Sequence, residues 1–147
     1  MLSNTCKYAI RAVLYLTINE EENKKIGIKK ISEDLEMPTP FLGKILQVLS
    51  KNKLLNSTKG PHGGFSLGKD AKNISLLDIV EIIDGLDFFH NCVIGVRICE
   101  DDDEKKKLCP FHQELDPLRD KLYAQFKNLT VAKFRDGVSS IDAVLQL

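Results

Sequence analysis

The sequence predicts a mainly α-helical fold with a small β-hairpin: a winged helix-turn-helix followed by a long C-terminal helix for dimerisation. Three observations predict it. Apolar residues recur at three- and four-residue steps through the first half of the chain, which is typical of amphipathic helices. Two short strand-like runs, LLNST and GFSLG, flank the turn-forming segment KGPHG. A second apolar seam with helical spacing runs from Phe111 to Leu129.

The first helix is expected from Ser3 to about Asn19. Ser3 is a suitable N-cap, and the polar run NEEENKK ends the helix. The residues at helical spacing on its apolar face are Cys6, Ile10, Val13 and Thr17. A second, short helix with Ile28, Ile31 and Leu35 should end at the Met37-Pro38 step, because a residue before proline avoids the helical conformation.

A third helix is expected to begin near Pro40, whose missing N–H falls among donors that are unpaired at a helix start. Its apolar face carries Leu42, Ile45, Leu46 and Leu49. Three helices with a tight turn between the second and third form a helix-turn-helix pattern. The hairpin that follows supplies the wing.

A fourth helix is expected after Ser75, with Asp78 in a capping-box position and Gly85 at its end. The predicted organisation has three parts. Residues 1–87 form the winged-helix domain, 88–112 a cysteine-rich loop, and 113–147 the dimerisation helix with a C-terminal tail. Residues 131–147 have a mixed pattern that predicts no definite element.

The net charge is zero, with 21 basic and 21 acidic side chains, but the charges are unevenly distributed. From Pro40 to Lys72 there are six lysines and one acid, Asp70. A local excess of positive charge favours contact with phosphates, although any one of these lysines alone could simply be solvated. The composition and the absence of a long apolar run predict a cytoplasmic protein without a membrane partner.

A winged helix reads DNA by placing its third helix in the major groove, where side chains near the helix start reach base edges. The wing reaches the backbone or the minor groove. The candidate DNA-binding residues are Thr39, Phe41, Gly43 and Lys44 on the third helix, and Lys59, Gly60 and His62 on the wing. His62 fits a solvated turn residue equally well.

Three of the four cysteines lie close together at Cys92, Cys99 and Cys109, and His112 follows in the run CPFH. The C-x6-C-x9-C intervals are too wide for the close cysteine pairs of a zinc knuckle. Thiolates on a loop suit an iron–sulfur cluster, although spacing alone leaves three unrelated thiols as an equal alternative. A fourth ligand would come from His112, Cys6, a partner subunit or an exchangeable group. Cys6 also fits the apolar face of its helix, and His90 fits a structural position.

Several segments resemble the IscR/NsrR/CymR-type winged-helix regulators of the Rrf family. They are LSNTCKYAIRAVLYL, PTPFLGKILQVLSKNKLL, KGPHGGFSLGKD, ISLLDIVEIIDG and the loop ending CPFH, and the resemblance covers roughly residues 1 to 130. It implies a homodimeric DNA-binding repressor or activator, often with a [2Fe–2S] cluster. By position, the ligands would be Cys92, Cys99 and Cys109, and His112 matches a fourth ligand used by some members.

Two features depart from the family pattern. The interval between the second and third cysteines is longer and contains EDDDEKKK. The acid that some relatives place near the start of the first helix is missing, because the nearby residues are Lys7, Tyr8 and Arg11. These departures place His112, or else Cys6, in the role of fourth ligand.

The sequence therefore predicts a DNA-binding regulator that senses redox or iron–sulfur status through a [2Fe–2S] cluster. Its partners would be a double-stranded operator and a second copy of the chain, with no small-molecule substrate. The predicted dimer interface is the apolar seam of the last long helix, Leu115, Leu118, Leu122 and Phe126. The alternatives are a cluster-free sensor using thiol oxidation or zinc, and a protein-binding winged helix. An enzyme or electron carrier is disfavoured, because no nucleophile–base pair or phosphate-binding loop is visible.

Overall fold

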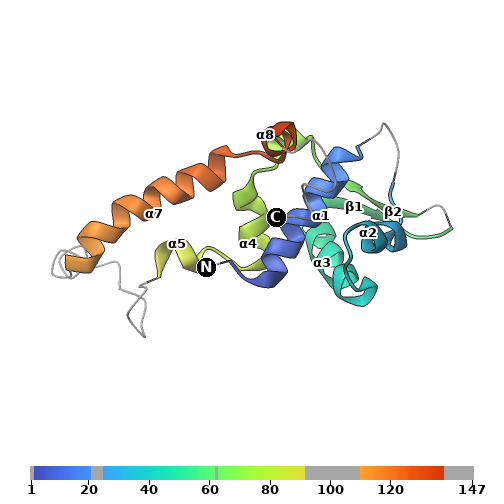
Figure 1. Cartoon of the computed structure of the whole chain (residues 1–147), viewed down its shortest axis with the longest axis horizontal. Coiled ribbons are helices and arrows are strands. Elements are labelled where there is room, and N and C mark those ends of the chain that lie inside the picture. Colours follow the sequence, from blue (N-terminus) through green and yellow to red (C-terminus); the bar gives the residue numbers. More distant parts are fainter. Residues whose placement is uncertain (1, 21–24, 62, 92–109, 138–147) are drawn as a thin grey trace.

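The computed structural model describes residues 2–20, 25–61, 63–91 and 110–137. A bundle of short helices carries a two-stranded wing on one side, and a long helix extends away on the other (Figure 1). The helices and strands are, in chain order, α1 Asn4–Ile18, α2 Ile28–Asp34, α3 Thr39–Lys51, β1 Leu55–Thr58, β2 Gly64–Leu67, the 3-10 helix η1 Ala71–Asn73, α4 Leu76–Ile83, α5 Asp87–His90, α7 Pro110–Asn128 and α8 Val131–Gly137. The predicted mainly α-helical fold with a hairpin wing is confirmed.

Helix α1 lies at the centre of the bundle. Residues 12–17 are all buried, so the C-terminal half of the helix is covered on every side. A helix that is buried all round must be the core of its domain. Neighbours of α1 include α3, α4, α8 and β2. Ser3 caps the helix as predicted, since its hydroxyl accepts a hydrogen bond from the Cys6 N–H.

The turn between α2 and α3 is held by a small set of polar contacts. The Ser32 hydroxyl donates to the Met37 carbonyl over 2.6 Å, and the Met37 N–H donates back to the Ser32 carbonyl. Glu36 has a φ of 53°, in the left-handed region that usually favours glycine. The chain therefore reverses within three residues, and Pro38 caps the start of α3.

The wing is an antiparallel hairpin in the register Leu55↔Leu67 to Thr58↔Gly64. Ile26 forms an isolated antiparallel bridge with Phe65, on the edge of β2 that does not pair with β1. A Cβ at Gly64 would lie 2.5 Å from the Ile26 carbonyl oxygen. Only glycine permits this close approach between the wing and the segment that precedes α2.

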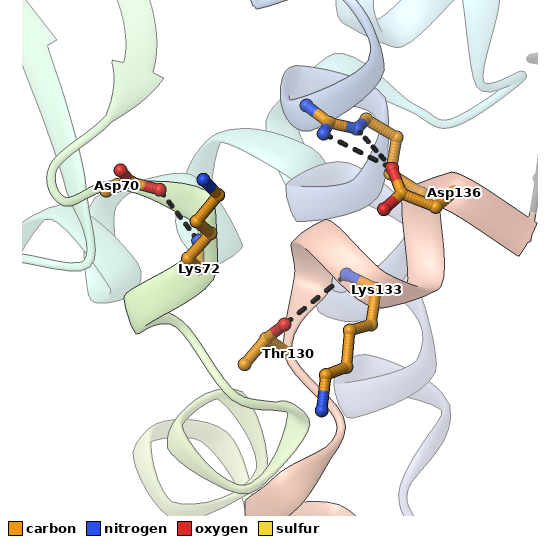
Figure 2. A network of polar contacts seen from close by, with 6 residues as sticks. Asp70, Lys72, Thr130, Lys133 and Asp136 are labelled. Atoms are coloured by element: carbon orange, nitrogen blue, oxygen red, sulfur yellow. Dashed lines mark hydrogen bonds and ion pairs between the residues drawn. The ribbon is translucent and has the colours of Figure 1, made fainter.

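Helix α4 begins with the predicted capping box, in which Ser75 and Asp78 each bond to the other's backbone N–H. Ser75 also forms a bridge with Thr130, which places the end of α7 beside the start of α4. Helix α8 then turns back to the bundle, because Val131 and Ala132 are buried in the main core. Figure 2 shows α8 next to η1, with Thr130 accepting from the backbone of Lys133 at the helix start.

Helix α7 reaches away from the bundle, and α5 lies beside it (Figure 1). Phe89 of α5 contacts Tyr123 and Phe126 of α7, with ring centroids 5.5 and 5.7 Å apart. In the described parts of the chain, no helix is both long and apolar enough to cross a membrane.

Candidate nucleic-acid interface

The outer face of α3 carries a polar stripe. Pro40, Lys44, Gln47 and Lys51 are exposed and recur at four- and three-residue steps. At 100° per residue they lie opposite the buried Leu42, Ile45, Leu46 and Leu49. The predicted apolar face is therefore confirmed as core, and the side of α3 that faces solvent presents two lysines and an amide. A lysine binds phosphate or guanine, and glutamine pairs in bidentate fashion with adenine.

Three of the predicted DNA-binding residues on α3 have packing roles. The Ser32 hydroxyl donates its one proton to the Met37 carbonyl. The Thr39 hydroxyl oxygen lies 2.8 Å from that of Ser32, so Thr39 must be the donor in this contact. Thr39 is thus left able to accept, but not to donate, toward a ligand. Phe41 is half-buried against Tyr8, with ring centroids 5.4 Å apart. A Cβ at Gly43 would lie 3.2 Å from Ile28 Cδ1, so this glycine lets α2 and α3 pack closely.

The wing tip presents an exposed lysine. Lys59 is exposed, and Gly60 has a φ of 109° and accepts a backbone hydrogen bond from Gly63 over 2.9 Å. This bond closes the tip of the hairpin. Beside the wing, Lys25 donates to the Thr58 hydroxyl over 2.5 Å. His62, the other residue predicted for the wing, lies outside the described residues.

The lysines between Pro40 and Lys72 face solvent. All six are exposed, namely Lys44, Lys51, Lys53, Lys59, Lys69 and Lys72. The ion pairs seen among the described residues involve Lys30, Arg119 and Arg135 instead. The six ammonium groups are therefore free of acidic partners within that part of the chain. Those of Lys44 and Lys51 on α3 and of Lys59 at the wing tip are available to a polyanion that contacts these two elements.

Sequence reasoning did not name Gln47 or Lys51 as candidate DNA contacts. The signal that identifies them is the polar stripe opposite the apolar one, which is visible in the sequence once α3 is known to be helical along its whole length. The general rule that residues near the helix start reach the bases instead favoured Thr39, Phe41 and Gly43, whose side chains or Cα atoms lie against neighbouring helices.

The predicted cluster ligands fall largely beyond what the structure describes. Cys92, Cys99 and Cys109 lie outside the described residues, and so does the side chain of His112, although its backbone belongs to the first turn of α7. Within the described residues, no group of three or more His, Cys, Asp or Glu side chains could hold a metal ion.

Cys6, the other thiol considered as a ligand, is fully buried beside Leu77, Val80 and Phe89. Burial, with a smaller contribution from the negative charge of Asp84, raises the pKa of Cys6 to about 12. A thiol that stays protonated is a poor metal ligand. This environment agrees with the interpretation of Cys6 as a core residue.

The predicted dimer residues of α7 occupy different environments. Leu118 is 60% exposed and Leu122 is 37% exposed, and Phe111 is exposed on the same helix. Leu115 is half-buried, and Phe126 is half-buried against the core of its own chain. The middle of the seam, at Leu118 and Leu122, therefore faces solvent, whereas Phe126 at its C-terminal end packs within the monomer.

The family model described as "Rrf2: Iron-dependent Transcriptional regulator" matches residues 2–136. The chain belongs to the Rrf2 family. A relative from Aquifex aeolicus, named as an HTH-type transcriptional regulator, is 30% identical over 131 residues, which cover 89% of this chain and 88% of the relative. The Escherichia coli HTH-type transcriptional regulator IscR is 28% identical over 141 residues, covering 96% of this chain and 83% of its own.

Solved structures of Rrf2-type regulators share this fold. CymR, the global cysteine regulator of B. subtilis, superposes with a TM-score of 0.72 at 20% identity, covering 92% of this chain and 96% of its own. IscR of T. potens gives a TM-score of 0.68 at 18% identity, covering 93% of this chain and 87% of its own. The protein is thus a transcriptional regulator with a DNA-binding winged helix, and the predicted family is confirmed.

Proposed function

We propose that this Rrf2-family regulator binds a double-stranded operator as a homodimer and senses redox or iron–sulfur status through a [2Fe–2S] cluster. The observation that supports operator binding most strongly is the exposed stripe of Lys44, Gln47 and Lys51 on α3. Helix α3 is the second helix of the helix-turn-helix, the one that enters the major groove in this class of protein. Lys59 at the wing tip extends the basic surface toward the DNA backbone.

The donor set suits an iron–sulfur cluster. Cys92, Cys99 and Cys109 would each supply a thiolate, and His112 an imidazole, and mixed thiolate–imidazole ligation occurs in clusters of this kind. Helix α7 begins at Pro110, so His112 and the residue after Cys109 share its first turn. The relative named IscR supports the same proposal. A bound cluster would supply a group whose charge and integrity change with redox conditions.

The second copy would cover the exposed part of α7. Leu118 and Leu122 are apolar side chains that water solvates in the isolated chain, and covering them is favourable. Near the other end of α7, an apolar groove of about 190 Å³ is lined by Leu2, Lys7, Ile10, Arg11, Leu76, Phe126 and Phe134. Its two basic side chains complement the acids that α7 exposes, Glu114 and Asp120. A two-fold dimer would place α7 of one copy across this groove of the other.

The experiment that tests operator contact is a salt titration of DNA binding by single variants. Lys44→Ala and Lys59→Ala should weaken binding and each lower the slope of log K against log salt by about one, if each lysine neutralises one phosphate. Gln47→Ala should relax specificity at one base pair, with a loss of about 1–3 kcal/mol for the preferred base. Lys133→Ala, at an exposed position of α8, is the matched control and should behave as wild type.

Wild-type affinity and salt slope in all three α3 and wing variants would place the DNA contact elsewhere and contradict the proposal. A protein-binding winged helix would retain no DNA even at low salt, whereas the proposed regulator should show salt-dependent retention.

A second candidate is a cluster-free sensor that uses cysteine oxidation. The likeness to CymR, which is described as a global cysteine regulator, supports it, as does the solved structure of an oxidised form of Staphylococcus aureus CymR. Both candidates use the same cysteines and the same winged helix. They differ in the presence of iron and sulfide in the protein purified without oxygen.

A further inference from the structure

Arg119 of α7 is buried, with 9% of its surface exposed. Among the described residues, it is the one Lys, Arg, Asp or Glu that is buried. Its guanidinium donates a hydrogen bond to the backbone carbonyl of Asn91. Its contact with Asp116 is long, 3.8 Å, and that carboxylate is 45% exposed. A buried charge is costly unless it is hydrogen-bonded, so the carbonyl of Asn91 is the partner that makes this position of Arg119 favourable.

Asn91 occupies a particular place in the chain. It is the C-cap of α5, where its N–H donates to the Asp87 carbonyl over 2.7 Å, and the next residue in the sequence is Cys92. Helix α5 is itself held on α7 by the contacts of Phe89 with Tyr123 and Phe126. The residue before the first candidate ligand is therefore fixed to α7.

The other end of the cysteine segment joins the same helix. Pro110 is the first residue of α7, and it directly follows Cys109. Segment 92–109 thus begins at a carbonyl that is bonded to Arg119 and ends at the start of the helix that carries Arg119. A change in the cysteine segment would reach α7 at two points, the helix start and Arg119, which is two and a half turns further along.

We infer that Arg119 is a positioning residue for the cysteine segment. By holding the carbonyl of Asn91 on α7, it fixes the residue that precedes Cys92 in the sequence and couples the state of the cysteines to the exposed seam of α7. The inference rests on the proposed function to the extent that those cysteines respond to redox conditions. It assigns Arg119 no contact with a cluster.

The first test needs no cluster. In the apo protein, Arg119→Ala should release the Asn91 carbonyl and increase amide hydrogen exchange in the α5 peptide, residues 87–91. Loss of one hydrogen bond to a charged donor predicts a change of about tenfold or more. Alkylation of Cys92 should accelerate by a similar factor relative to Cys109. Arg135→Ala is the matched control, because Arg135 is 39% exposed and pairs only with the adjacent Asp136 among the described residues.

The second test uses the protein purified without oxygen. Arg119→Ala should lose visible absorbance several-fold faster than wild type on exposure to air and should show a shifted reduction potential. Arg119→Lys, which keeps the charge and a donor, should recover part of the difference. Arg135→Ala should match wild type in both measurements.

Unchanged exchange in α5 in the Arg119→Ala variant would overturn the inference. Faster exchange with unchanged Cys92 alkylation and an unchanged potential would also overturn it, because Arg119 would then only stabilise α5. If wild type holds no iron or sulfide, the proposed cluster is wrong. The alkylation of Cys92 in Arg119→Ala still decides the role of Arg119 in that case.

Discussion

At the scale of single residues, backbone conformation and hydrogen bonds fix the angle between the two helices of the DNA-reading motif. Glu36 adopts a left-handed conformation in the turn between α2 and α3, which costs an L-amino acid roughly 1–2 kcal/mol. Ser32, Met37 and Thr39 form the hydrogen bonds that hold the turn. The turn thus stays closed at the expense of strain at one exposed residue.

Replacing Glu36 with glycine should therefore stabilise the fold. Glu36→Gly is expected to raise the free energy of unfolding by about 1 kcal/mol, because glycine adopts the left-handed region without strain. The matched control is Glu33→Gly, three residues earlier and inside α2. It should lower stability by up to about 1 kcal/mol, since glycine disfavours the helical conformation and Glu33 lies in the last turn of α2. Urea denaturation of both variants measures these changes, and the same sign in both would contradict the account of the turn.

A second residue-scale contact joins α1 to α2. The buried Tyr15 donates its hydroxyl to Asp34 over 2.6 Å, and Lys30 binds the same carboxylate over 2.9 Å. The hydrogen bond from Tyr15, followed by that from Lys30, lowers the pKa of Asp34 below its usual value. Burial, followed by the same contact with Asp34, raises the pKa of Tyr15.

The lowered pKa of Asp34 predicts a pH dependence. Because the folded state favours the carboxylate, its contribution is complete above the ordinary aspartate pKa of about 4 and is lost as the pH falls through the lower folded value. Asp34→Asn should cost about 1 kcal/mol at neutral pH, and the difference from wild type should shrink below about pH 4. Glu81→Gln, at an exposed site on α4, is the control. A difference that grows on acidification would contradict this assignment.

At the scale of elements, local signals predicted most of the helices and the wing. The capping box of Ser75 and Asp78 and the apolar stripe of α3 each lie within a few residues of sequence, and the structure confirms both. Helix α8 was not predicted from the sequence, because its burial depends on contacts with α1 and η1, which are distant in the sequence. Its short apolar set, Val131 and Ala132 with Phe134 beside them, carries no helical signal strong enough alone.

The apolar seam of α7 likewise shows what a local sequence pattern cannot predict. Helical periodicity identified an apolar face, but periodicity does not tell whether the same chain or a second chain covers it. The structure divides the face, because Phe126 packs on the monomer core and Leu118 remains exposed. The candidate site divides in the same way. Of the residues predicted to contact DNA, Lys44 is exposed on α3, whereas Phe41 packs on Tyr8 and Gly43 lies close to Ile28; DNA contact by any of them stays a prediction.

The exposed part of α7 predicts the effect of a charge in the seam. Leu118→Asp should shift the protein from dimer to monomer in sedimentation, because a buried carboxylate without a partner is strongly unfavourable in an apolar interface. Its stability as a monomer should change little, since the side chain is 60% exposed. Gln125→Asp, at an exposed position of the same helix, adds the same charge and should remain dimeric. A Leu118→Asp variant that sediments as a dimer would exclude this seam as the interface.

At the scale of the whole molecule, the helices that flank the cysteine segment in the sequence lie apart from the DNA-binding elements. Helix α3 and the wing lie on one side of the bundle, and α5 and α7 lie on the other (Figure 1). Under the proposed function, a signal from α7 would pass to α4, which α7 contacts, and on to α1, which contacts α4 and α8. In the proposed dimer, α7 would set the positions of the two α3 helices, and the cysteine segment would then control the half-site spacing.

The most direct test of the proposed sensing function is the metal content of wild type purified without oxygen. We expect visible absorbance with iron and acid-labile sulfide in equal amounts. The absorbance should disappear in Cys92→Ala, Cys99→Ala and Cys109→Ala and persist in Cys6→Ala, whose thiol is buried. His112→Ala should keep part of it with a shifted potential. Zinc in place of iron, or full iron and sulfide in all three loop variants, would contradict the account.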